Sequence, residues 1–173
     1  MTLRRLFLLR HAKSSWDEPG LSDHDRPLAP RGRRASRVIA EHMRWKRIAP
    51  ELVLCSSARR TRQTLTRIAP ALGEDVDVRI EPELYAASAT DLLKLLREVP
   101  DEVDSVMLIG HNPGIEDLTV ELAGTGEELG RVREKFPTAA LATLEFDRSW
   151  RELEPGGAEL TSFVKPKELA RSS

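Results

Sequence analysis

Two histidines and two arginines follow apolar runs of this chain, at points where a buried strand would open to solvent or to a pocket. Arg10 and His11 follow the run LFLL, Arg60 comes shortly after ELVLCS, and His111 follows VMLIG. Arginine pairs with phosphate through two parallel N–H donors. A neutral imidazole can attack phosphorus. These residue types therefore indicate an anion site, with phosphoryl transfer as the chemistry that they could perform.

This chemistry needs no metal ion, and we expect neither a metal nor any other cofactor. Zinc sites require three or four His, Cys, Asp or Glu ligands, and arginines around His11 and His111 would repel a cation. The only cysteine, Cys55, cannot form an internal disulfide and fits a small core position. A cysteine phosphatase would need Cys-x₅-Arg, but Thr61 stands where that arginine should be.

Apolar runs alternate with segments of helical periodicity along the whole chain. Strands are predicted over 3–9, 51–56, 77–80, 104–110, 140–146 and 158–164, and helices over 31–47, 58–72, 89–99 and 113–124. This alternation predicts an α/β fold, a three-layer α/β/α sandwich whose central sheet is mostly parallel with an antiparallel edge. We expect a single domain over residues 1–165 and a frayed tail over 166–173.

The expected sheet would gather the reactive residues at one edge. Ligands bind outside the carboxyl ends of the strands in such sheets, and three of the predicted strands end in Arg10–His11, Ser56–Ser57 and Gly110–His111. Helix N-termini at the same edge add N–H donors and partial positive charge. The elements thus support a phosphate site.

Three motifs at those strand ends resemble a known family. LLRHAKSSW resembles the Arg-His-Gly signature of the histidine phosphatase superfamily, CSSARRTRQT is similar to its Ser-Pro-x-x-Arg-Ala-x-Gln-Thr motif, and LIGHNPG is similar to its second-histidine motif. More closely, RHAKSSWD with DHDRPLAPRG resembles the SixA-type phosphohistidine phosphatases, a small branch without large insertions. The motifs occur in family order, and Ala12 replaces the family glycine after the histidine.

The resemblance implies specific roles for the four residues. His11 would be the nucleophile that becomes phosphorylated, with Arg10 as a phosphate ligand. The family arginine stands three residues before the glutamine of Gln-Thr, which selects Arg60 here. His111 matches the second histidine, which helps to hold the phosphoryl group.

Other residues near the motifs have further expected roles. Arg26, in DRPL, looks like a further phosphate ligand of the SixA-type branch. Lys13 and Ser14 follow His11, and either phosphate contact or ordinary loop hydrogen bonding remains open for both. We expect Arg59 to face solvent or the edge of the pocket.

The loop that precedes the first predicted helix contains further polar residues. Asp23 and Asp25 are expected to form local turn hydrogen bonds, and His24 is expected to be an exposed loop residue. In the first predicted helix, His42 is expected to pack partly buried on the apolar side.

The expected site also needs a general acid if its substrate has an alkoxide leaving group. Family phosphomonoesterases and mutases supply a carboxylate after the third strand, where this chain offers Glu81 and Glu83. Glu83 is the candidate, but the Gly/Glu-rich loop that follows in those relatives is missing. An alkoxide leaving group needs a proton, whereas an imidazole can leave already protonated. The lack of a clear general acid therefore fits a substrate with a P–N bond better than a sugar phosphate.

These observations predict a phosphatase that acts through a phosphohistidine intermediate, with phosphohistidine on a protein as the expected substrate. A phosphomonoesterase of a small phosphorylated metabolite and a non-catalytic phosphate-binding module are the alternatives. The net charge of −1 argues against nucleic-acid binding, and no apolar run reaches the length of a membrane span. We expect a cytoplasmic monomer whose partner is a phosphorylated protein or a small phosphate.

Overall fold

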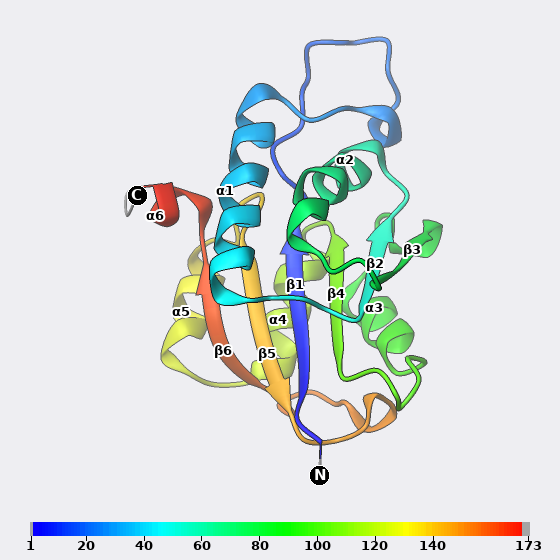
Figure 1. Cartoon of the computed structure of the whole chain (residues 1–173), viewed down its shortest axis with the longest axis vertical. Coiled ribbons are helices and arrows are strands. Elements are labelled where there is room, and N and C mark those ends of the chain that lie inside the picture. The colour runs from blue at the N-terminus through cyan, green and yellow to red at the C-terminus, as the bar shows by residue number, and fades with distance from the viewer. Residues whose placement is uncertain (1, 171–173) are drawn as a thin grey trace.

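The computed structural model describes residues 2–170 and contains one six-stranded sheet (Figure 1). Its strands are β1 (Arg4–Arg10), β2 (Leu52–Ser56), β3 (Asp77–Glu81), β4 (Ser105–Gly110), β5 (Leu141–Phe146) and β6 (Glu159–Val164). The spatial order is β3-β2-β4-β1-β5-β6, in which β3, β2, β4 and β1 are parallel. The strands β5 and β6 are antiparallel to their neighbours. The predicted mostly parallel sheet with an antiparallel edge is confirmed.

Helices cover both faces of this sheet. They are α1 (Pro30–Lys46), α2 (Arg59–Ile68), α3 (Ala89–Leu96), α4 (Gly114–Ala123), α5 (Glu127–Glu134) and α6 (Pro166–Ala170). Short 3₁₀ turns occur at η1 (Asp23–Asp25), η2 (Ala69–Ala71), η3 (Pro82–Leu84) and η4 (Trp150–Glu152). In Figure 1, α1 and α2 lie in front of the sheet, while α3, α4 and α5 lie behind it.

The alternation of side chains along β1 explains the three layers. Phe7 and Leu9 pack with apolar residues of α1 and α2, whereas Leu6 and Leu8 pack with those of α3, α4 and α5. Because successive residues of a strand point to opposite faces, a strand buried on both faces is apolar throughout. Cys55 of β2 is fully buried in the first of these clusters, as expected, and burial raises the pKa of its thiol to about 12.

Two elements near the C-terminal part of the chain differ from the sequence prediction. The helix α5 was not expected, because only Leu129 and Val132 are buried along its otherwise polar sequence. Residues 166–170 were expected to be frayed but form α6, whose Leu169 packs against the α1 side of the core. Residues 171–173 of the expected tail lie outside the described part of the chain.

Gly32, in the first turn of α1, allows the helix to approach the loop that follows β1. A Cβ at this position would lie 2.1 Å from the backbone oxygen of Lys13. That same oxygen accepts a hydrogen bond from the backbone N–H of Ala29. The close approach fixes the loop after β1 against the start of α1, next to the carboxyl ends of the strands.

Candidate active site

His11 directly follows β1, and only 8% of its surface is exposed. Its backbone N–H donates to Gly110 O, which extends the pairing of β1 with β4. The ring Nδ1 lies 2.7 Å from Ala12 O. Because a carbonyl oxygen only accepts, Nδ1 carries the proton and Nε2 keeps a free lone pair. His11 therefore has the tautomer that a nucleophilic imidazole requires.

His111 directly follows β4 and lies beside His11, with 5.1 Å between the ring centroids. Its Nε2 shares a 2.7 Å hydrogen bond with Oγ of Ser56, the last residue of β2. The hydroxyl of Thr61 donates to Ser56 O and ties the first turn of α2 to the end of β2. The ends of three neighbouring strands thus meet at the two rings, as the sequence predicts.

Burial makes both histidines weak bases. It lowers the pKa of His11 to about 3, and the hydrogen bond to Ala12 O only partly opposes this effect. Burial also lowers the pKa of His111 to about 4, with the positive charge of Arg60 as a second cause. An unperturbed imidazole titrates near pH 6.5, and both pKa values lie well below that. Both rings are therefore uncharged at neutral pH.

Arg10 and Arg60 bring positive charge to the histidines from two different elements. Arg10 Nη1 donates to Phe136 O at 2.9 Å, and Arg10 Nε is buried with no hydrogen-bond partner in the described part of the protein. Arg60 lies in the first turn of α2 and is 7% exposed. The positive charges of both guanidinium groups lower the pKa of His11, because each disfavours a second positive charge on that ring.

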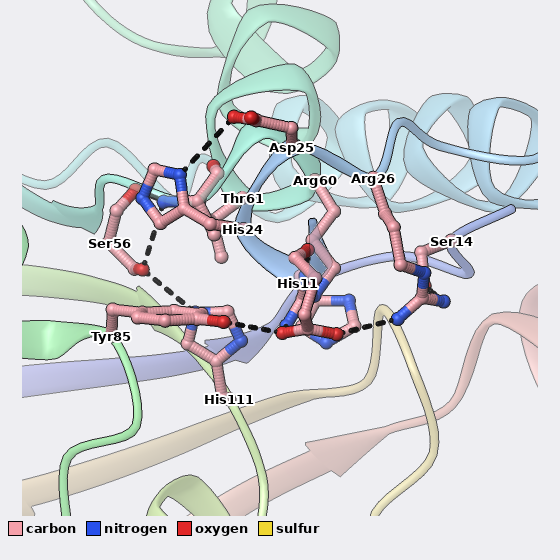
Figure 2. A network of polar contacts seen from close by, with 12 residues as sticks. His11, Ser14, His24, Asp25, Arg26, Ser56, Arg60, Thr61, Tyr85 and His111 are labelled. Atoms are coloured by element: carbon pink, nitrogen blue, oxygen red, sulfur yellow. Dashed lines mark hydrogen bonds and ion pairs between the residues drawn. The ribbon is translucent and has the colours of Figure 1, made fainter. Parts of the chain in front are cut away.

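The carboxylate of Asp23 accepts hydrogen bonds from three side chains, those of Tyr85, Arg60 and Arg26. Figure 2 shows these three residues around His11 and His111. One oxygen accepts from Tyr85 Oη at 2.6 Å and from Arg60 Nη2 at 3.0 Å, and the other accepts from Arg26 Nη1 at 3.0 Å. Together, the hydrogen bonds from Tyr85, Arg60 and Arg26 hold the pKa of the Asp23 carboxyl well below its usual range. The group is an ionised acceptor in this arrangement and not a proton donor.

Arg26 is buried within the loop that follows β1. Its Nε donates to Ser15 O at 3.0 Å, and its Nη2 donates to Ser14 Oγ at 2.5 Å. The indole ring of Trp16, which is 72% exposed, covers the guanidinium at 3.2 Å from the ring centroid. The two expected phosphate ligands Arg26 and Ser14 therefore contact each other, and Arg26 organises the loop.

Tyr85 is a site residue that the sequence interpretation missed. Its ring makes edge-to-face contacts with His111 and His24, at centroid distances of 5.5 and 4.9 Å. His24 also shares a 2.9 Å hydrogen bond with Ser57 Oγ and is half-buried, so the expectation of an exposed loop residue is wrong. Tyr85 is the only tyrosine of the chain and follows the third strand, which is the signal that could have identified it.

The turn residues differ from one another in their contacts. Asp25 accepts a hydrogen bond from Ser22 Oγ, which is the local turn bond that the sequence predicts. The Asp23 side chain also makes a local bond, accepting from Arg26 Nη1, but its further partners Arg60 and Tyr85 come from distant parts of the chain and were not predicted. A turn signal records only neighbours in sequence and does not reveal such partners.

The remaining candidates lie away from these contacts. Glu83 is exposed and lines a hollow of about 530 Å³ between β2, β3 and α3. Lys13 is exposed, and Arg59 Nη1 donates to Asp25 O at 3.3 Å. Among the contacts of the described residues, none joins Glu83 to His11, His111 or Arg60.

Two kinds of feature are absent from the described residues. No group of three or more His, Cys, Asp and Glu side chains in this part of the chain is arranged to hold a metal ion. Within residues 2–170, no helix combines the length and apolar character needed to cross a membrane.

The fold and the two-histidine arrangement agree with the family relationship. The family model of the histidine phosphatase superfamily (branch 1) matches residues 6–139. The chain belongs to this superfamily and is a SixA-like hydrolase of it.

The most informative relatives are two bacterial proteins and one solved structure. An uncharacterised Mycobacterium tuberculosis protein, Rv1276c, is 38% identical over 92% of this chain and 100% of its own length. The phosphohistidine phosphatase SixA of Escherichia coli is 30% identical over 84% of this chain and 87% of its own. A structure reported as a SixA phosphohistidine phosphatase from Nakamurella multipartitia superposes with a TM-score of 0.85 at 31% identity, covering 96% of this chain and 98% of its own.

Proposed function

We propose that this protein hydrolyses phosphohistidine on a protein, through a covalent phosphohistidine intermediate at His11. The observation that carries the proposal is the protonation pattern of the site. His11 is a neutral imidazole with a free Nε2, and Asp23, the loop carboxylate that bonds to Arg60, is held ionised. The site thus offers a nucleophile without a ready proton donor for a leaving group.

The first step transfers the phosphoryl group to His11. Nε2 of His11 forms a bond to phosphorus while the P–N bond of the substrate breaks, and the electron pair of that bond stays on the substrate nitrogen. A substrate imidazole that already carries a proton on its other nitrogen leaves as a neutral ring. No proton transfer from the enzyme is needed. Nδ1 of His11 remains protonated and donates to Ala12 O throughout.

The second step returns His11 to its original state. A water molecule attacks phosphorus, the bond to Nε2 breaks, and its electron pair returns to Nε2. The product leaves as inorganic phosphate, which carries the oxygen and protons of the water. The same tautomer serves both steps because neither step uses the proton on Nδ1.

Arg10, Arg60 and His111 stabilise the phosphoryl group during both transfers. Positive charge near the equatorial oxygens is the main catalytic contribution in phosphoryl transfer. Arg10 Nε, buried without a partner in the described part of the chain, gains an acceptor when a phosphoryl oxygen approaches. Arg26 adds charge from the loop and keeps the loop in place.

A substrate panel with a trapping experiment tests this proposal. The protein is offered free phosphohistidine, a phosphohistidine peptide, p-nitrophenyl phosphate and sugar phosphates, and phosphate release is measured. We expect both P–N substrates to be turned over well above the phosphomonoesters, with an acid-labile phosphoenzyme that is absent in His11→Ala. Faster turnover of sugar phosphates would identify a metabolite phosphatase. Binding of phosphate without any phosphoenzyme would identify a non-catalytic module.

A further inference from the structure

Charged side chains are distributed very unequally between the two helical layers. On one face, α1 carries five arginines and one lysine against a single glutamate, and α2 carries four arginines and no acidic residue. On the other face, α3, α4 and α5 together carry seven acidic and three basic residues. Although the net charge of the chain is only −1, α1 and α2 therefore form a strongly basic face.

A groove on this basic face lies next to the candidate active site. Its volume is about 690 Å³, and its walls include Arg33 of α1 with Arg59 and Arg67 of α2. The opposite wall is the loop after β1, which contributes Asp17 and Glu18. We call this hollow the α1–α2 groove.

The loop gives the groove a direct connection to the site. Ser15 lines the groove, while its backbone oxygen accepts the hydrogen bond from Arg26 Nε. Arg59 lines the groove, while the next residue, Arg60, contacts Asp23 beside the histidines. A chain lying in the groove is thus separated from the site by a single loop.

The arginines of the groove are not paired with Asp17 or Glu18 of the opposite wall. Within residues 2–170, Arg33, Arg59 and Arg67 form no ion pair, and the hydrogen bonds of Arg33 and Arg59 go to backbone oxygens. Trp16 is 72% exposed on the same loop, between Ser15 and Asp17. Exposed tryptophan and arginine are the residues that most often anchor protein partners.

We propose that the α1–α2 groove docks an acidic segment of the substrate protein, next to its phosphohistidine. This inference rests on the proposed function, and it names the chemistry of the partner. Glutamate or aspartate side chains of the segment pair with Arg33, Arg59 and Arg67 on one wall of the groove. A polypeptide is favoured over a nucleic acid because Asp17 and Glu18 line the opposite wall of the groove. A polypeptide can place carboxylates opposite the arginines and uncharged or basic residues opposite Asp17 and Glu18, whereas a nucleic acid carries a negative charge at every phosphate.

Two phosphohistidine peptides of equal length test the docking surface. One has glutamates flanking the central phosphohistidine, and the other has glutamines at the same positions. At low salt we expect kcat/KM to be about tenfold higher for the glutamate peptide, and the preference to fade at high salt. Free phosphohistidine is measured in parallel because it can reach the site without occupying the groove.

Matched charge reversals identify the surface responsible. The groove variant combines Arg33→Glu with Arg67→Glu. The control variant combines Lys94→Glu on α3 with Arg133→Glu on α5, so that both variants have the same net charge. We expect the groove variant to lose the preference for the glutamate peptide and the control to keep it. Turnover of free phosphohistidine should be the same in wild type and both variants.

Several results would overturn the docking proposal. They are equal kcat/KM for the two peptides with wild type, a preference that survives in the groove variant, and equal loss in the control variant. Tighter binding of a short DNA duplex, dependent on Arg33 and Arg67, would assign the groove to nucleic acid instead. If no phosphohistidine substrate is turned over, the proposed function fails. The groove is then judged by fluorescence anisotropy of the unphosphorylated glutamate peptide with wild type and both variants.

Discussion

The two histidines follow neighbouring β-strands, whereas Asp23 and Arg26 lie on a loop that passes above the strand ends (Figure 1). His11 is held by the bond from its backbone N–H to Gly110 O, His111 by the bond from Ile115 N–H to its own backbone oxygen, and both are almost fully buried. The loop residues are held by side-chain hydrogen bonds and ion pairs, and the Asp23 side chain is half exposed. The strands thus supply the reacting groups in a fixed geometry, and the loop supplies charge through contacts that substitution can loosen.

Loss of the nucleophile on β1 should have the largest effect. His11→Ala is expected to lower kcat on a phosphohistidine substrate at least about a thousandfold, because the covalent route is removed. The thermal unfolding midpoint should remain close to that of wild type. Phosphate release and circular dichroism measure the two quantities. Activity near the wild-type value would remove His11 from the proposed mechanism.

The next largest effect should separate two adjacent arginines of α2. Arg60→Ala is expected to lower kcat/KM about a hundredfold, because a buried positive charge beside the histidines is lost. Arg59→Ala is the matched control, since Arg59 donates to Asp25 O and forms no ion pair or hydrogen bond with the site residues among residues 2–170. With free phosphohistidine as substrate, its kcat/KM should change less than about threefold. Equal losses in the two variants would contradict the assignment of Arg60.

The fold and the two site residues that directly follow strands, His11 and His111, could be predicted from the sequence for a simple physical reason. Strands buried on both faces are continuous apolar runs, and the parallel order brings their carboxyl ends to one edge. Each run ends at a polar residue, so His11 and His111 are located by pattern alone.

The contacts of the site residues on the loop could not be predicted in the same way. The sequence around Asp23 predicts only a turn residue. Its contact with Tyr85 joins positions 62 residues apart, so no local pattern could indicate it. Similarly, α5 has too few apolar residues to show a helical pattern, and α6 depends on packing of Leu169 against the core. Such features are determined by tertiary contacts and leave little local signal.

Removal of the loop carboxylate should have a moderate effect. Asp23→Asn keeps the size of the side chain but loses the ion pairs with Arg26 and Arg60. We expect kcat/KM on free phosphohistidine to fall about tenfold, because the two guanidinium groups lose their common anchor. Tyr85→Phe removes only one hydrogen bond to the same carboxylate and should cost less, about threefold. A larger loss in Tyr85→Phe than in Asp23→Asn would indicate that Tyr85 acts independently of Asp23.

The smallest effect should appear in the titration of the histidines. The negative charge of Asp23 raises the pKa of His111 against the larger lowering by burial, and no such contribution acts on His11. Asp23→Asn should therefore lower the pKa of His111 further below its wild-type value of about 4, and leave the pKa of His11 near 3. Both values can be followed by the NMR chemical shifts of the imidazole carbons as the pH falls from 7. In each protein the rings should stay neutral down to pH values well below 6.5.

An equal shift at both rings would mean that the loop charge reaches β1 as strongly as β4. Titration of either ring near 6.5 would mean that water enters the site freely, because burial is the main cause of both lowered pKa values. The expected selective shift at His111 would instead show a loop that adjusts the electrostatics of the second histidine. The nucleophile would then keep a protonation state that is set by its own burial and by its hydrogen bond to Ala12 O.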